Sequence, residues 1–173
     1  MSKRFSLRDY QESMLGRMEV ATATSQADAR LGVEVGGRNW LVELSDTAEV
    51  LPVPAIASVP LTHSWFCGVA NVRGNLLSVV DLQAFGGEGA QLLTPLSRIL
   101  PIHPRILPHA ALLVGRMQGI KHLADMTVQE AQAMDAPVWC GAQYCDAGGQ
   151  VWRELDIKRL AIEPAFLQAG IIA

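Results

Sequence analysis

The amino-acid sequence predicts a mainly β fold with little helix. Several short segments alternate apolar and polar side chains with a period of two residues, which is the spacing of a half-buried strand. Glycine-containing turns, such as residues 36–37 and 146–149, separate some of these segments, and prolines interrupt the chain between others. Many short strands at this spacing indicate an antiparallel barrel or sandwich.

The first 29 residues are predicted to form a helix followed by a linker. Ser6 and Asp9 have the spacing of a capping box at the start of a helix. Behind them, apolar side chains recur at helical spacing and form one stripe, made by Leu7, Tyr10, Met14, Leu15 and Met18. We favour a helix docked on the protein's own surface; a partner-binding helix is the alternative, because methionine-rich faces adapt to varied surfaces. A second unit is predicted over residues 30–173.

Residues 30–96 are predicted to contain two hairpins and one further strand. Residues 31–35 and 40–44 alternate on either side of a glycine pair and form the first hairpin. A third strand is predicted over residues 47–53, after which prolines keep the chain extended. Residues 66–72 and 76–82 form the second hairpin. A single helical turn, capped by Asp81, and a loop over residues 86–96 follow.

The rest of the chain is predicted to be extended, with one closing helix. Prolines 101, 104 and 108 exclude a helix around them, so we expect extended chain and a turn over residues 103–109. The remaining predictions are strands over residues 110–117 and 120–126, a connecting segment over 127–134, a hairpin over 139–145 and 150–155, and a short helix before Pro164. The letters RILP occur at residues 98–101 and again at 105–108, but two copies in different surroundings do not establish a repeat.

Composition narrows the range of functions. The 173 residues are 50% hydrophobic and 18% charged, which is typical of one globular domain or of two small lobes sharing a core. The net charge of −3 includes no basic excess, so nucleic acid is not expected as a partner. The sequence has no secretory segment and no apolar run of membrane-spanning length, and we therefore expect a cytoplasmic protein without direct membrane insertion.

No cofactor or metal site is predicted from the motifs. The sequence lacks a phosphate-binding glycine loop and a dinucleotide fingerprint. Its four histidines are scattered, and its three cysteines fit free thiols better than a disulfide framework. Cys67 is flanked by apolar residues, which favours burial over reactivity.

The stretch from Trp65 to Leu82 carries the clearest functional signal. Two apolar runs flank the residues Asn71-Val72-Arg73-Gly74, which have the chemistry of a tight turn. Arg73 is therefore expected at a rigid bend between two buried strands, where it can meet a carboxylate or a partner surface.

The same stretch resembles the CheW-like domain family. Its signature, W-x-x-G-x-x-N-x-R-G followed by D-L, is matched by Trp65, Gly68, Asn71, Arg73, Gly74, Asp81 and Leu82. The resemblance extends over roughly residues 30–166, and within the family it looks most similar to adaptors of twitching motility. It implies two small five-stranded β-barrels packed around a common core.

The resemblance also implies a function and a site. Members of this family are non-enzymatic adaptors that couple methyl-accepting chemoreceptor tips to a CheA-type histidine kinase, here in a pathway that controls the type IV pilus. The partner-binding residues carried over by the resemblance are Glu49, Val50, Asn71, Arg73 and Gly74. One departure is Gly115, which follows Leu112-Leu113-Val114 where family members commonly have an aspartate, and contacts made by the second lobe are not assigned.

Two other functions remain open from the sequence. A small β-barrel enzyme would use Cys67 or a histidine as its reactive group. A fragment of the kinase itself is a third hypothesis, because its regulatory domain shares this fold. The absence of an ATP-binding motif and the short chain oppose it.

Overall fold

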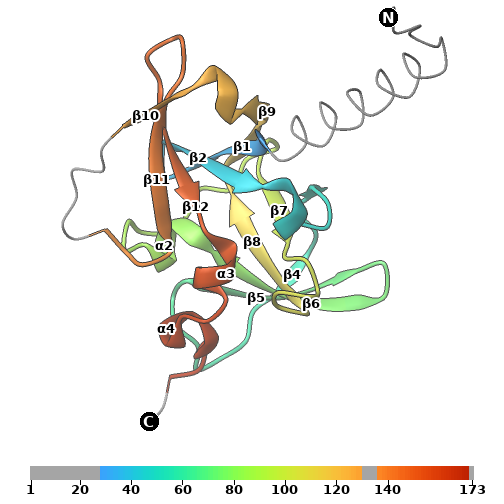
Figure 1. Cartoon of the computed structure of the whole chain (residues 1–173). Coiled ribbons are helices and arrows are strands. Elements are labelled where there is room, and N and C mark those ends of the chain that lie inside the picture. Colours follow the sequence, from blue (N-terminus) through green and yellow to red (C-terminus); the bar gives the residue numbers. More distant parts are fainter. Residues whose placement is uncertain (1–27, 130–135, 172–173) are drawn as a thin grey trace, which may run out of the picture.

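The protein folds into two curled β-sheets packed against each other (Figure 1). The computed structural model describes residues 28–129 and 136–171. Each sheet has six strands, where the family resemblance implied five, and the two edge strands of the second sheet are only two residues long. The mainly β class is confirmed. The predicted N-terminal helix and the linker up to residue 27 lie outside the described residues, and Ala29, expected to end the linker, is the first residue of a strand.

The first sheet combines strands from both ends of the chain. Its middle is a parallel pair, β2 beside β12, and the other neighbours in the sheet are antiparallel. In spatial order the strands are β10 (Thr127–Gln129), β11 (Cys140–Cys145), β12 (Val151–Leu155), β2 (Arg38–Glu43), β1 (Ala29–Val35) and β9 (Arg116–His122).

The second sheet repeats this arrangement. Its parallel pair is β6 beside β8, again with antiparallel neighbours on both sides. In spatial order the strands are β4 (Ile56–Ala57), β5 (Phe66–Val72), β6 (Asn75–Asp81), β8 (Ala110–Val114), β7 (Arg98–Pro101) and β3 (Leu51–Pro52). Every strand of one sheet corresponds to the strand six places away along the chain in the other. The fold is therefore an internal repeat of six strands, β1–β6 and β7–β12. The first two strands of each half, β1–β2 and β7–β8, belong to the sheet formed by the other four strands of the opposite half.

Two short sequence features recur at equivalent positions of the two halves. A Cys-Gly pair lies at a register shift near the start of each long hairpin, Cys67-Gly68 in β5 and Cys140-Gly141 in β11. Each hairpin ends in an aspartate that caps one helical turn. Asp81 accepts a hydrogen bond from the Ala84 amide at the start of α2 (Leu82–Phe85), which confirms its predicted capping role. Asp156 does the same for Arg159 at the start of α3 (Ile157–Leu160).

Two apolar cores hold the halves together. The central core lies between the sheets and includes fully buried residues of both, such as Val33, Val42, Leu112 and Leu155. The side core lies against the other face of the second sheet and consists of Ala70, Leu77, Val79, Ile99, Ala111 and Leu113. Because β8 contributes alternate residues to both cores, its five residues are all buried.

The predicted hairpins agree with the structure. The hairpins β1–β2, β5–β6 and β11–β12 form where alternation and turn residues predicted them. The short helix predicted before Pro164 is α3. A further short helix, α4 (Pro164–Leu167), follows it.

Two predicted strands are wrong in their extent. The strand over residues 47–53 is reduced to a bridge between Thr47 and Ile102 and the two residues of β3, because a 3-10 turn, Leu44–Asp46, precedes it and Pro52 has no amide to donate. The strand over residues 110–117 ends at Val114. At Gly115 the chain crosses to the first sheet, and its amide donates to the Glu34 carbonyl.

The following segments are corrected in the same way. The strand expected over residues 120–126 begins earlier, at Arg116, and gives way to a 3-10 turn, Leu123–Asp125. Residues 127–129, expected to be a connection, form β10. The pattern of apolar residues does not reveal where the chain leaves one strand partner for another. This explains why the end of one strand at Val114 and the start of the next at Arg116 were misplaced.

Candidate partner-binding site

Arg73 is displayed by a two-residue turn at the tip of the β5–β6 hairpin. Val72 pairs with Asn75, so Arg73 and Gly74 alone make the turn, with φ angles of 52° and 86°. Two successive positive φ angles are typical of a type I′ turn, whose twist matches that of the strands. The Asn71 side-chain oxygen accepts a hydrogen bond of 2.9 Å from the Gly74 amide, which fixes the turn further.

The guanidinium of Arg73 forms an ion pair with Glu49. Its Nη1 atom lies 2.8 Å from Oε2 and 3.1 Å from Oε1 of that carboxylate. The Arg73 side chain is 72% exposed and that of Glu49 is 34% exposed. The guanidinium therefore faces solvent, and the carboxylate lies nearer to the body of the protein. An ion pair as exposed as this contributes only about 0–1 kcal/mol to folding.

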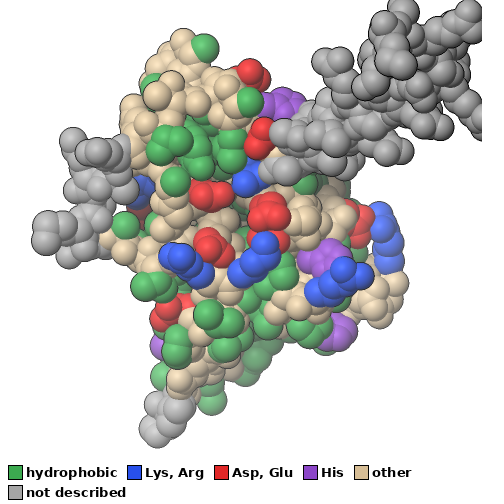
Figure 2. Space-filling model, in the orientation of Figure 1, with side chains coloured by type: hydrophobic (Ala, Val, Ile, Leu, Met, Phe, Trp, Pro, Cys, Tyr) green, Lys and Arg blue, Asp and Glu red, His purple; other side chains and the backbone are tan. Residues whose placement is uncertain are grey.

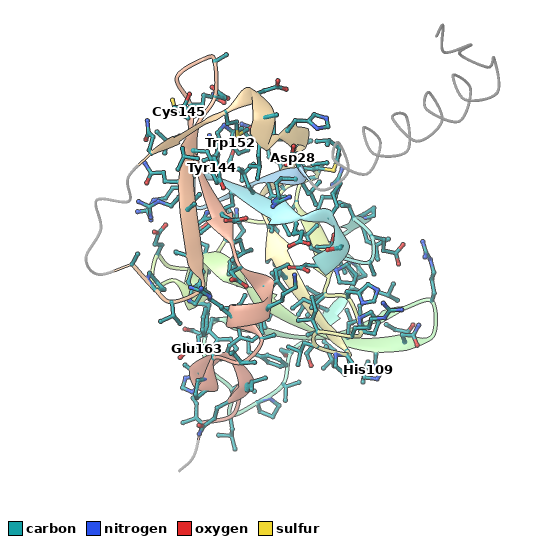
Figure 3. The ribbon with its side chains drawn as sticks, viewed as in Figure 1. Asp28, His109, Tyr144, Cys145, Trp152 and Glu163 are labelled. Atoms are coloured by element: carbon teal, nitrogen blue, oxygen red, sulfur yellow. The ribbon has the colours of Figure 1, made fainter. Side chains whose placement is uncertain are left out.

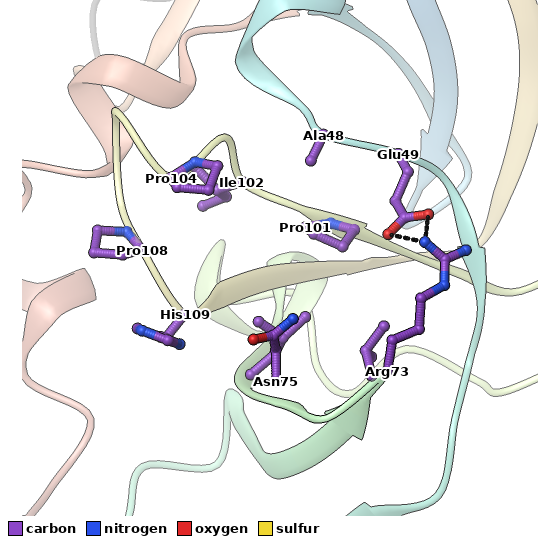
Figure 4. A pocket seen from close by; sticks show the side chains of 11 residues that line it. Ala48, Glu49, Arg73, Asn75, Pro101, Ile102, Pro104, Pro108 and His109 are labelled. Atoms are coloured by element: carbon purple, nitrogen blue, oxygen red, sulfur yellow. Dashed lines mark hydrogen bonds and ion pairs between the residues drawn. The ribbon is translucent and has the colours of Figure 1, made fainter.

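The ion pair stands at the rim of a groove of about 280 Å³ (Figure 4). Prolines 101, 104 and 108 and the side chains of Ile102 and Leu77 supply apolar walls. His109 closes one end with a φ angle of 60°, and its Nδ1 lies 3.3 Å from the Leu76 carbonyl. Backbone strain of this kind is concentrated at functional sites, and two of the three strained non-glycine residues of the described chain, Arg73 and His109, line this groove.

A second groove, of about 200 Å³, lies on the other side of Pro108 and His109. Its walls are Phe66 and Val80 from the hairpin and Phe166 and Leu167 from α4. The two grooves share Pro108 and His109 as a common wall. The site thus offers apolar concavities beside one exposed charged pair.

The sequence-predicted site residues separate into two groups. Arg73 and Glu49 come together and present charge at the surface. Asn71 and Gly74 serve the turn itself, and Val50 is half-buried against the central core. A role of these five residues in partner binding stays a prediction. The proline wall and His109 were not singled out from the sequence, although the proline-rich turn was a visible signal for them.

The electrostatics of the surface are mixed. Acidic and basic side chains are interspersed across the middle of the face shown in Figure 2, without a broad area of one sign. Among the described residues no group of three or more His, Cys, Asp or Glu side chains is arranged to hold a metal ion. In the same part of the chain, no helix is long and apolar enough to cross a membrane.

Cys67 is poorly suited to nucleophilic chemistry. Burial, with the nearby Asp81 carboxylate, raises the pKa of its thiol to about 11. A catalytic cysteine needs the opposite shift, because the thiolate is the reactive form. The geometry therefore gives no support to the enzyme hypothesis at this residue.

Comparisons with known proteins agree with the fold and with the signature. Over 105 residues, 61% of this chain, the sequence is 32% identical to Protein PilI of Pseudomonas aeruginosa, and the match spans 58% of that protein. The crystal structure of scaffolding protein TtCheW from Thermoanaerobacter tengcongensis superposes with a TM-score of 0.63 at 17% identity, covering 75% of this chain and 88% of that one. The CheW-like domain model matches residues 30–164. The resemblance seen in the sequence is confirmed, and the chain belongs to the CheW-like domain family.

Proposed function

We propose that the protein is a non-enzymatic adaptor of a chemosensory pathway that controls type IV pilus twitching motility. It would bind the cytoplasmic tips of chemoreceptor-like proteins and a CheA-type histidine kinase. The observation that carries this proposal is the ion pair Arg73–Glu49 at the rim of an apolar groove. Membership of the CheW-like family and the match to Protein PilI support it. The proposal implies a cytoplasmic protein that reaches membrane receptor arrays through its partners.

The geometry fits the binding of a helical hairpin. An amphipathic helix buries its apolar side chains in a groove, and a charged residue at the rim then selects its orientation. The two grooves beside His109 would take apolar side chains, and the outward guanidinium of Arg73 would meet an acidic group.

Coupling would arise from unequal binding of two receptor states. If the adaptor contacts one state more strongly, it shifts the receptor population toward that state by the difference in binding free energy. Holding receptor and kinase together then passes this shift to the kinase.

Charge reversal at Arg73 tests the proposal. Arg73→Glu removes a guanidinium that is 72% exposed and takes part in a surface ion pair, so the melting temperature should barely change. Loss of an arginine that is a hot spot of an interface costs about 2 kcal/mol or more, so capture of the purified receptor tip or kinase should weaken about 30-fold. Affinity is measured by titration with each partner, beside a thermal melt of each variant.

The matched control is Arg116→Glu. Arg116 forms an ion pair of 2.7 Å with Glu34 and is 53% exposed, but it lies on β9 of the other sheet. We expect it to leave capture unchanged. Exchanging the charges, as Glu49→Arg with Arg73→Glu, should restore the pair but rescue binding only in part, because the partner meets reversed charges. Normal capture of both partners by folded Arg73→Glu would show that the site assignment is wrong.

A further inference from the structure

Asp46 is a buried carboxylate in the segment that leads to the site. It ends the 3-10 turn Leu44–Asp46, and its side chain is only 4% exposed. The Nζ atom of Lys158, in α3, lies 3.1 Å from its Oδ1. The same ammonium group lies 3.2 Å from Oε2 of Glu43, whose Oε1 accepts a hydrogen bond from the Ser45 hydroxyl. Lys158 is the one cation that the structure pairs with Asp46 within the described residues.

The backbone around Asp46 is attached to the wall of the groove. The Asp46 carbonyl accepts a hydrogen bond of 2.8 Å from the His103 amide, and the Ala48 amide donates to the Pro101 carbonyl at 3.0 Å. Ala48 and Pro101 line the groove, and Glu49 follows directly. Two residues, Thr47 and Ala48, therefore separate the buried carboxylate of Asp46 from the Glu49 carboxylate that pairs with Arg73.

Loss of the ammonium group would disturb this attachment. A buried carboxylate without a compensating cation is strongly unfavourable, so Asp46 would have to move toward water or take up a proton. Burial already raises the pKa of Asp46, and the hydrogen bond to Asp46 raises the pKa of Lys158. Movement of Asp46 would strain the hydrogen bond from the His103 amide to the Asp46 carbonyl, and it would displace Ala48 and Glu49.

We propose that Lys158 is a positioning residue for the partner-binding site, acting through Asp46 on Glu49. The pair ties α3, at the end of the second half of the chain, to a groove wall supplied by the first half. The packing of the C-terminal region thus determines where the Arg73–Glu49 pair stands. This inference deepens the proposed function and rests on it for its effect on partner affinity.

The test replaces Lys158 by glutamine in the full chain. In Lys158→Gln we expect the amides of Ala48 and His103 to exchange with solvent about tenfold faster or more, because their segment is loosened locally. The side-chain Nε–H resonance of Arg73 should shift in a two-dimensional NMR spectrum, since its ion pair is displaced. Capture of the receptor tip or kinase should weaken by a smaller factor than in Arg73→Glu.

The matched control is Arg159→Gln at the next position of α3. Arg159 is 63% exposed and pairs with Asp156 of its own turn, so exchange at Ala48 and the Arg73 resonance should stay as in the wild type. The double variant Asp46→Asn with Lys158→Gln removes both charges and should bring both readouts back toward wild type, which a purely structural role of Lys158 would not do.

Each outcome has a definite meaning. Unchanged exchange at Ala48 and an unchanged Arg73 resonance in Lys158→Gln would overturn the inference while leaving the proposed function standing, because neither readout needs a partner. If Lys158→Gln does not fold, the double variant decides: recovery of both readouts supports the pairing, and failure to recover overturns it. The proposed function is tested separately, by Arg73→Glu.

Discussion

The hairpins β5–β6 and β11–β12 occupy equivalent places in the two sheets but use their turns in opposite ways. The β5–β6 turn is two residues long and presents Arg73 to a neighbouring segment and to solvent. The β11–β12 turn directs its Asp146 carboxylate back into its own hairpin. There it accepts hydrogen bonds from the amides of Gly148 and Gln150, each 2.9 Å, and from the Trp152 indole at 3.0 Å.

The two turns differ in whether their charged side chain is already engaged by its own hairpin. The Trp152 indole, followed by the two amides, lowers the pKa of Asp146, so this carboxylate is already engaged by its own turn. His109, at the groove, and Cys145 and Trp152, at the other turn, are labelled at opposite ends of the molecule in Figure 3. Under the proposed function, one turn of the repeat would bind partners through Arg73, whereas the Asp146 side chain at the equivalent turn only stabilises its own hairpin.

The largest expected effect comes from separating the halves. Residues 28–97 alone would keep β1, β2 and β3–β6 but lose β9–β12, which complete the first sheet, and β7–β8, which pair with β3 and β6. We expect this fragment to show no cooperative thermal transition, because the central core needs both halves. Circular dichroism melts of the fragment and of the whole chain make the measurement. A cooperatively melting fragment would mean that the halves are independent units.

Removing the carboxylate of the second turn should affect stability and not capture. In Asp146→Ala two amides and one indole lose their acceptor, so the melting temperature should fall clearly below that of the wild type. Arg73→Glu should show the reverse pattern, with weakened capture and little change in melting. A loss of capture in Asp146→Ala would place partner contacts at the β11–β12 turn as well.

Replacing the glycine of either turn by alanine, as Gly74→Ala or Gly149→Ala, should lower the free energy of unfolding by a similar amount. Gly74 and Gly149 have φ angles of 86° and 77°, and a Cβ atom at either position would meet no neighbour within 4 Å. The strain of the left-handed backbone alone should therefore destabilise each variant by about 1 kcal/mol. Denaturant titration measures this loss. Only Gly74→Ala should also weaken capture, because only that turn carries Arg73.

The smallest effect on folding and capture at neutral pH concerns the two free cysteines at equivalent places of the repeat, Cys67 and Cys140. Burial raises the pKa of both Cys67 and Cys140, and for Cys67 the shift is from 9.0 to about 11. At pH 8 Cys67 should hold about 100-fold less thiolate than a free cysteine and react correspondingly slowly with a disulfide reagent.

The same shift predicts a pH dependence. Because the folded pKa is the higher one, the unfolded chain loses this proton first as the pH rises, and stability should decline between about pH 9 and 11. Mass-spectrometric labelling and melts across this range provide the check. Rapid labelling of Cys67 at pH 8 would contradict the burial and reopen the enzyme hypothesis.

The sequence predicted correctly those elements that are determined by residues close together in the chain. The period-two hairpins, the Asp81 cap and the tight turn under Arg73 follow from neighbouring residues, and each is present. The proximity of Arg73 to Glu49 could be expected only from the family resemblance, which implies that the matching acid and arginine lie near each other, because nothing in the spacing of these two residues indicates contact.

The repeat and the grooves could not be predicted in the same way. Period-two alternation assigns a face to each side chain but says nothing about which strand lies beside it, so the exchange of hairpins between sheets was not visible. The RILP echo is unrelated to this repeat, as expected from its differing surroundings, since only its first copy is a strand. The marks that follow the true repeat, Cys-Gly and the capping aspartates, are too short to stand out. The proline wall of the groove reaches Glu49 only through the tertiary fold.

The exchange of hairpins has a consequence for how the chain is made. β2 finds its parallel partner only when β12 has been synthesised, since Asn39 pairs with Trp152. At ordinary translation rates the N-terminal hairpin waits on the order of ten seconds for that partner. During that time β9 can pair with β1 but the sheet on the β2 side stays incomplete, so the nascent chain should depend on the ribosome surface or on a chaperone to keep β1–β2 from associating with other chains.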